Sequence, residues 1–329
     1  MNSRRQSILI IKPSSLGDIV HTLPAVAAIR DANPDAEITW VIKPEWAPLL
    51  RGNPDVNHVH LFPRGDFTII GAPRSLVPWL RKTRALQPDM AIDFQGLLRS
   101  AMIAKVSGAK QIFGLSDARE GSRFFYHHVA KVNRHEHAVE RYLKLAEAAG
   151  ATIGPALRCP LPTGDELPRF DEHPPFILLH PFARGGGKSL PPDVIKAFCD
   201  AFAPTRVVVV GKSKRTFEAP DNCIDLTNQT TLLELVRLIR AAHFVISVDS
   251  GPMHIAAAVT DRLVSIHTWT NPARVGPYNP DAFIWKQGHL LRLADLEKAG
   301  KLRGSRRFGR NDVARVVKHV LDAYPVPAF

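Results

Sequence analysis

Cysteine is scarce in this sequence of 329 residues. The three copies, at positions 159, 199 and 223, are far apart and form no C-x-x-C pair. An odd, scattered set of this kind argues against a disulfide framework and gives no indication of a zinc site. The composition fits a reducing compartment, so we expect a cytoplasmic protein.

Long apolar runs are also missing. No stretch approaches the roughly 20 apolar residues that a membrane-spanning helix requires. The first residues contain two arginines and then a four-residue apolar run, which is too short for the core of a signal peptide. Any membrane contact is therefore expected to be peripheral.

Acidic residues are outnumbered, with 31 Asp and Glu against 43 Lys and Arg, which gives a net charge of +12. Such an excess suggests an anionic partner, which could be nucleic acid, an anionic membrane surface, or a substrate with phosphates or carboxylates. The alternative is that the charge only aids solubility. No helix-turn-helix, RNP or zinc-finger pattern accompanies the charge, so we expect no nucleic-acid partner.

Short apolar runs alternate with helical patterns along the chain. The first run, Ile8 to Ile11, is continuous and predicts a strand buried on both faces. Further strands are predicted at 37–42, 56–61, 90–94, 176–180, 206–210, 244–249 and 264–267. Residues 268–310 are predicted to be irregular and basic. The alternation predicts an α/β protein with doubly wound parallel sheets.

A proline-rich stretch divides the chain. Residues 154–175 contain six prolines, and proline resists regular structure, so this segment is predicted to be a linker. We expect domains at 1–165 and 166–329, which agrees with the prior of roughly 150 residues for each domain. A helix at 312–324 ends the chain and could pack back on the first domain.

A small polar loop follows the first strand and contains Lys12, Ser15, Gly17 and Asp18. Asp18 lies where strand gives way to helix, at the edge where open α/β sheets bind ligands. An aspartate in this place is a good helix N-cap. Equally, the loop could bind a polar substrate and remove a proton from it. It matches neither of the glycine-rich nucleotide motifs.

The segment Ser116 to His137 mixes cations and aromatic residues. It could be a contact surface for a phosphorylated or carboxylated acceptor, or an ordinary solvated basic loop. Its four histidines lack the H-E-x-x-H spacing, so a metal site is disfavoured.

Two loops of the second half could hold a diphosphate. Three glycines and Lys188 follow the strand at 176–180, and Asp249, Ser250 and Gly251 follow the strand at 244–249. Glycine allows close approach of the backbone, and a helix start offers N–H groups to an anion. The alternative is that Asp249 and Ser250 merely cap a short helix.

Three segments together resemble the signatures of lipopolysaccharide heptosyltransferases, which are glycosyltransferase family 9 enzymes. They are residues 12–24, residues 93–97 with Ser100, and residues 247–254. The resemblance spans most of residues 8–280. It implies a GT-B fold of two Rossmann-like domains that face a central cleft, and an inverting transfer of heptose from ADP-heptose to the Kdo or heptose inner core.

The resemblance also implies roles for single residues. Asp18 would be the catalytic base. The donor would be bound by Lys188, Thr230, Asp249, Ser250, Gly251 and His254. The acceptor, an anionic lipid-linked sugar of the Kdo2-lipid A type, would be bound by Lys12, Ser15, Gln95, Arg119, Arg123 and His135. No metal or other cofactor is expected, and the protein would lie peripherally on the inner face of the inner membrane.

Some points stay open. Glu218 is a candidate for the ribose contact, and residues 285–307 match no pattern of the family. Type I and type II heptosyltransferases are not distinguished, and neither is the oligomeric state. The alternatives are a family relative with another nucleotide sugar or acceptor, and a non-catalytic anion-binding α/β protein.

Overall fold

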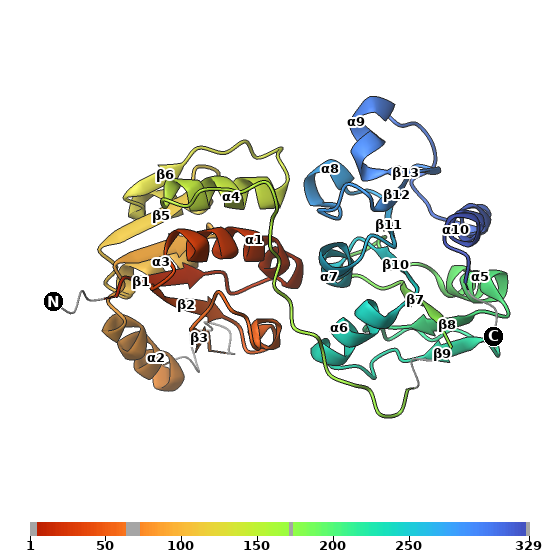
Figure 1. Ribbon diagram of the computed structural model, residues 1–329, viewed down its shortest axis with the longest axis horizontal. Coiled ribbons are helices and arrows are strands. Elements are labelled where there is room, and N and C mark those ends of the chain that lie inside the picture. The colour runs from red at the N-terminus through yellow and green to blue at the C-terminus, as the bar shows by residue number, and fades with distance from the viewer. Residues whose placement is uncertain (1–4, 64–72, 171–173, 327–329) are drawn as a thin grey trace. The chain divides into compact units, whose positions relative to one another are not determined.

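The computed structural model describes residues 5–63, 73–170 and 174–326. It divides into two compact units, Met1–Pro162 and Thr163–Phe329, each with a sheet and its helices (Figure 1). The division falls three residues before the domain boundary expected from the prolines.

The described part of the first unit has a six-stranded parallel sheet in the order β3-β2-β1-β4-β5-β6. Its strands are β1 Ser7–Ile11, β2 Glu37–Ile42, β3 His58–Leu61, β4 Met90–Asp93, β5 Gln111–Leu115 and β6 His128–Ala130. Its helices are α1 Leu16–Ala32, α2 Pro73–Ala85, α3 Leu98–Val106 and α4 Ala138–Ala148, with 3-10 turns η1 Ala47–Leu50 and η2 Ser122–Phe125.

Helices cover both faces of this sheet. Leu9 and Ile11 of β1 share one core with Trp79 of α2 and Ala101 of α3. Successive side chains of a strand point to opposite faces, so the buried Ile10 points to the other face. The contacting pair α1 and α4 lies apart from that first core. A strand with no solvent face explains the continuous apolar run of β1.

The second unit has a seven-stranded sheet in the order β13-β12-β11-β10-β7-β8-β9. Neighbouring strands are parallel except for the antiparallel pair β12 and β13. Its strands are β7 Phe176–His180, β8 Arg206–Val209, β9 Cys223–Asp225, β10 Phe244–Val248, β11 Leu263–His267, β12 Phe283–Lys286 and β13 His289–Arg292. Its helices are α5 Pro192–Phe202, α6 Leu232–Ala241, α7 Gly251–Val259, α8 Pro272–Val275, α9 Leu296–Ala299 and α10 Arg310–Ala323, with the 3-10 turn η3 Leu293–Asp295.

The last helix, α10, contacts α5 and buries its valine face in the core of the second unit. That core includes Val313, Val316 and Phe198. The apolar face of α10 is therefore used within its own unit, whereas the sequence allowed for packing on the first domain.

The structure corrects the prediction that residues 268–310 are irregular. This stretch contains β12 and β13, which extend the second sheet, and three short helical segments. The buried Trp285 of β12 fixes the stretch, because it packs in the core and its indole N–H donates to Asp312 at 3.0 Å.

The predicted linker is irregular in its described residues, 154–170 and 174–175, but it is held in place. Arg158 pairs with Asp31 at 2.6 Å and with the buried Asp55 at 3.2 Å. Further along, the backbone N–H of Asp165 donates to Leu233 O of α6 at 3.1 Å. The first part of the segment therefore belongs to the first unit, and the later part belongs to the second unit.

Candidate active site

Asp18 is anchored at the start of α1. The helix begins at Leu16, with Ser15 as its N-cap residue, which places Asp18 at the third helical position. The alternative that Asp18 is the N-cap residue is therefore wrong. Asp18 Oδ2 instead accepts hydrogen bonds from the Ser15 backbone N–H at 3.0 Å and from the Ser15 hydroxyl at 2.6 Å. This is the carboxylate half of a capping box.

The carboxylate of Asp18 keeps access to solvent, since its side chain is 40% exposed. Its position near the helix start favours the charged form, because the positive end of the helix dipole lies there. Its other oxygen, Oδ1, lies 3.9 Å from Lys12 Nζ. The site therefore presents a fixed, solvent-accessible carboxylate beside a cation.

Lys12 is buried, with 2% of its side chain exposed. Its ammonium donates to Phe94 O at 3.0 Å and to the Tyr142 hydroxyl at 2.7 Å. Burial works to lower the pKa of Lys12, but the charges of Tyr142 and Asp18 and the hydrogen bond to Tyr142 raise it. Lys12 is thus a buried cation beside Asp18, and its expected contact with the acceptor stays a prediction.

Asp93 organises the second signature. Its buried carboxylate accepts hydrogen bonds from the backbone N–H groups of Gln95 and Gly96, from Ser100 Oγ at 2.8 Å and from the Tyr126 hydroxyl at 2.7 Å. Burial raises the pKa of Asp93, and these hydrogen bonds oppose the rise. Asp93 therefore shapes the turn, in which Gly96 takes the positive φ of 67° that favours glycine.

This turn brings one predicted acceptor residue to the Asp18 loop. The side-chain oxygen of Gln95 accepts the backbone N–H of Ser14 at 3.4 Å. The backbone N–H of Arg119 donates to Gly96 O at 2.9 Å. Gln95 and the backbone of Arg119 are thus tied to the same edge of the sheet as Ser15 and Asp18.

The other predicted acceptor residues lie farther along the Ser116–His137 segment. Arg123 is exposed on η2, and His135 is exposed in the loop after β6, where Arg134 Nε lies 3.3 Å from its ring nitrogen. The segment is more ordered than a solvated loop, since it contains η2 and β6. Within the described residues, no group of three or more His, Cys, Asp or Glu could hold a metal ion.

In the second unit, Ser250 is the N-cap residue of α7 and Gly251 is its first helical residue. The Ser250 hydroxyl lies 3.1 Å from the buried His180 Nδ1 and 3.0 Å from Val248 O. Burial lowers the pKa of His180 to about 4, so the imidazole is neutral at pH 7. His254 is buried one turn into the same helix. A helix start of this kind can bind an anion.

Lys188 lies at this helix start, where its ammonium is 2.7 Å from Asp249 Oδ2. Burial of Asp249 opposes its ionisation, but nearby His267 and Lys188 keep its pKa below the ordinary value. Because burial lowers the pKa of His267 to about 4, Lys188 supplies the positive charge at neutral pH. Lys188, Asp249, Ser250 and Gly251 therefore form one cluster at the carboxyl edge of the second sheet.

Thr230 lies apart from that cluster. It is partly buried and directly precedes Thr231, the N-cap residue of α6, which follows β9. Thr231 forms the capping box, since its N–H donates to Glu234 at 2.7 Å. Glu218 is exposed between β8 and β9.

Two residues at these edges were not singled out from the sequence. Tyr142 contacts Lys12 across 130 positions of the chain, so no local pattern indicates it. Trp269 follows β11, and the Lys188 ammonium lies 4.9 Å from the centre of one of its rings. A tryptophan two residues after the predicted strand at 264–267 was the available signal.

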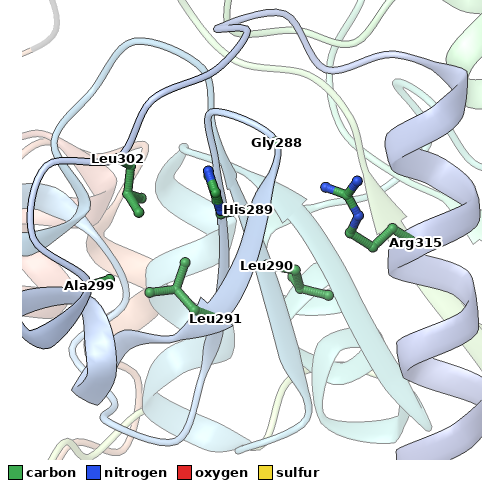
Figure 2. A pocket seen from close by; sticks show the side chains of 7 residues that line it. All are labelled: Gly288, His289, Leu290, Leu291, Ala299, Leu302 and Arg315. Carbon is green, nitrogen blue, oxygen red and sulfur yellow. The ribbon is translucent and has the colours of Figure 1, made fainter.

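A cavity of about 420 Å³ lies elsewhere in the second unit (Figure 2). Its lining comes from β13, α9, α10 and the turns next to them, and consists of Gly288, His289, Leu290, Leu291, Ala299, Leu302 and Arg315. None of the predicted donor residues lines it. Figure 2 shows leucine side chains from β13 on one part of its wall and Arg315 of α10 on another.

None of the described helices has both the length and the apolar character needed to cross a membrane.

Sequence comparison matches residues 79–304 to the model of glycosyltransferase family 9 (heptosyltransferase). Lipopolysaccharide heptosyltransferase 1 of Salmonella typhimurium is 28% identical over 329 residues, covering 90% of this chain and 99% of the relative. The protein of the same name from Pseudomonas aeruginosa is 29% identical over 301 residues, covering 82% of this chain and 81% of the relative.

Structure comparison gives the same fold. E. coli heptosyltransferase WaaC with ADP has a TM-score of 0.74 and 22% identity, covering 97% of this chain and 100% of that chain. E. coli ADP-heptose lps heptosyltransferase II has a TM-score of 0.76 and 21% identity, covering 97% of this chain and 98% of that chain. The expected α/β fold of the GT-B type is confirmed.

Proposed function

The chain belongs to glycosyltransferase family 9, and from this premise we propose that it is an inverting lipopolysaccharide heptosyltransferase. Its donor is ADP-heptose, and its acceptor is a hydroxyl of the Kdo or heptose inner core. The names of the relatives support the choice of reaction, and the titles of the structural neighbours support an ADP-linked donor. The observation that carries the proposal in this chain is the fixed, accessible carboxylate of Asp18.

Asp18 acts as the general base. Its carboxylate takes the proton of the acceptor hydroxyl, whose oxygen forms a bond to the anomeric carbon of the heptose. The bond between that carbon and the ADP oxygen breaks, and ADP leaves with the electron pair. A single displacement of this kind inverts the anomeric carbon. Ser15 keeps the carboxylate in one orientation through its two short hydrogen bonds, which lowers the cost of reaching the reactive geometry.

Lys12 is a positioning residue that acts through Asp18. Its buried ammonium is fixed by Phe94 O and Tyr142 and lies 3.9 Å from Asp18 Oδ1. A positive charge at this distance favours the carboxylate over the carboxylic acid. It thereby keeps the base in its proton-accepting form.

The donor diphosphate binds at the start of α7. Gly251 offers backbone N–H at the positive end of the helix, and Lys188 offers an ammonium. Asp249, Ser250 and His254 shape this pocket, and Thr230 lies toward the adenosine. The ammonium of Lys188 and the positive end of α7 offset part of the charge of the leaving diphosphate, and no metal ion is included in the proposal.

The acceptor binds at the edge formed by Ser15 and Gln95, with Arg119, Arg123 and His135 toward its anionic groups. Two guanidinium groups suit phosphates and carboxylates, because each can donate two parallel hydrogen bonds. The exposed positions of Arg119, Arg123 and His135 support this assignment.

We further propose peripheral binding to the inner face of the inner membrane through η2 and α3. Phe124 of η2 is 94% exposed, and Leu98 and Met102, one turn apart on the contacting helix α3, are also exposed. Arg123 is next to Phe124 in the sequence, Lys105 is three residues after Met102, and both are exposed. Apolar side chains with flanking cations are the combination that binds an anionic bilayer surface.

Vesicle sedimentation tests the membrane proposal. The Phe124→Ser variant is expected to bind anionic phospholipid vesicles several-fold more weakly than the parent. Leu321→Ser, which removes an exposed apolar side chain from α10, is the matched control and is expected to bind like the parent. Equal binding by Phe124→Ser and the parent would contradict the assignment of this surface.

The reaction itself is tested by incubating the protein with ADP-heptose and a Kdo2-lipid A acceptor and measuring the mass of the product by mass spectrometry. The expected product gains one heptose. ADP is expected to raise the thermal unfolding temperature, since it binds the folded state. Protection by an oligonucleotide and none by ADP would favour an anion-binding protein without this activity. Transfer from another nucleotide sugar alone would identify a different family 9 enzyme.

A further inference from the structure

Trp269 stands out among the tryptophans of the chain. It lies two residues after the end of β11 and is 55% exposed, whereas Trp40 and Trp285 are completely buried. An indole has one of the largest apolar surfaces of any side chain, so its exposure forgoes much of the stabilisation that burial gives. Single exposed apolar residues are common, so its surroundings must decide whether the exposure has a function.

The backbone on both sides of Trp269 is held firmly. The ammonium of Lys286 donates to Thr268 O at 3.2 Å and to Thr270 O at 2.7 Å. The hydroxyl of Thr268 donates to Gly187 O at 3.0 Å, which joins this loop to the glycine-rich loop after β7. The indole is thus presented to solvent from an anchored loop.

The indole also lies next to the groups proposed to bind the diphosphate. Lys188 Nζ is 4.9 Å from the centre of a Trp269 ring and 2.7 Å from Asp249 Oδ2. One ammonium therefore contacts both the indole and the carboxylate at the start of α7. The distance from the Lys188 ammonium to the indole is about the length of one sugar ring, so a sugar attached to a phosphate at Lys188 lies within reach of the indole.

The strand order indicates which part of the donor meets Trp269. The sheet runs β11-β10-β7-β8-β9 in this part. Thr230, on the adenosine side, follows β9, and the diphosphate site follows β10. Trp269 follows β11, on the opposite side of β10 from Thr230. A nucleotide sugar that lies along this edge therefore directs its sugar toward Trp269.

We propose that Trp269 is a specificity-determining residue that packs its indole against the sugar ring of the donor. This inference rests on the proposed function, because it takes the donor to be a nucleotide sugar. The C–H groups on one face of a pyranose are apolar and pack flat on an aromatic ring, which removes the surfaces of both from water. The other role open to the indole is to orient Lys188 alone.

Binding measurements with ADP and ADP-heptose separate these roles. Trp269→Ala is expected to weaken ADP-heptose binding about tenfold and to change ADP binding by less than about twofold. Trp269→Phe, which keeps an aromatic face, is expected to restore most of the lost affinity. Isothermal titration without acceptor measures both ligands, since no transfer takes place. Equal losses for ADP and ADP-heptose, or no loss for either, would overturn the proposal.

Fluorescence provides a second readout that a role in folding would not produce. ADP-heptose is expected to protect part of the tryptophan emission from acrylamide quenching, and ADP is expected to protect less. In Trp269→Phe this difference should vanish. No difference between the two ligands in the parent would refute the sugar contact. If neither ligand binds the parent, the proposed function itself fails, whereas donor binding that is insensitive to Trp269 refutes only this inference.

Discussion

Replacing Lys12 by methionine tests how the first unit prepares Asp18 for catalysis. Methionine keeps the length and the apolar stem of lysine but removes the ammonium that lies 3.9 Å from Asp18 Oδ1. At this distance two unit charges attract by about 1 kcal/mol in water and about 4 kcal/mol at the effective dielectric constant near a protein surface. Because Asp18 is 40% exposed, solvent screening favours the lower part of this range.

An attraction of about 1–2 kcal/mol corresponds to about one pH unit. The acid limb of the pH profile of kcat, where activity falls as the base becomes protonated, is therefore expected to move up by about one pH unit in Lys12→Met. The sign follows from the charge, because losing a nearby cation favours the protonated carboxyl. At pH values where Asp18 is deprotonated in both proteins, the kcat values of parent and variant should differ much less.

Tyr142→Phe is the matched control. It removes the 2.7 Å hydrogen bond to Lys12 but leaves the ammonium in place, so its acid limb is expected within a few tenths of a pH unit of the parent. The assay is initial-rate transfer at saturating substrates between pH 3 and pH 7, the range in which an aspartate titrates. An unchanged acid limb in Lys12→Met, with a folded protein, would refute the electrostatic role of Lys12.

Three further predictions concern stability and are checked by denaturant unfolding. The hydrogen bonds that Asp89 accepts from Lys110 and Ser7 lower its pKa to about 2, so this carboxylate stabilises the fold above pH 4 and loses the effect as pH falls toward 2. Asp89→Asn should therefore lower the free energy of unfolding by about 1–2 kcal/mol at pH 7 and by less at pH 3. An equal cost at both pH values would contradict this. Tyr126→Phe removes a 2.7 Å donor from buried Asp93 and should cost about 1.5–3 kcal/mol. In Gly114→Ala the new Cβ would overlap the Tyr126 ring, so a neutral effect would contradict that packing.

The central strands could be predicted from the sequence, because each is an apolar run buried on both faces. The bounds of β2 and β7 agree with the prediction at every residue. The missed strands are β5, β6, β9, β12 and β13, of which β6, β9 and β13 lie at sheet edges and have three or four residues. Such strands depend on pairing with distant segments, and their local sequence carries little periodicity.

The loops of the candidate site could be found from the sequence, because they follow strands at one edge of each sheet. The burial and the exact position of single side chains could not be predicted from the sequence. Lys12 follows a buried strand as a polar residue, and only its contact with Tyr142 of α4 shows that it is buried. Asp18 lies at the third helical position and not at the N-cap, because the helix begins at Leu16, two residues before it.

Transfer of heptose by Asp18→Asn, compared with the parent, tests the central claim most directly. Asparagine has nearly the same shape but cannot accept the proton of the acceptor hydroxyl, and general-base catalysis typically contributes 10²–10⁴-fold. We expect kcat to fall by about this factor while the affinity for ADP, whose proposed site is in the second unit, stays unchanged. Transfer at the parent's rate by a folded Asp18→Asn protein would contradict the account and leave Asp18 with a purely structural role at the start of α1.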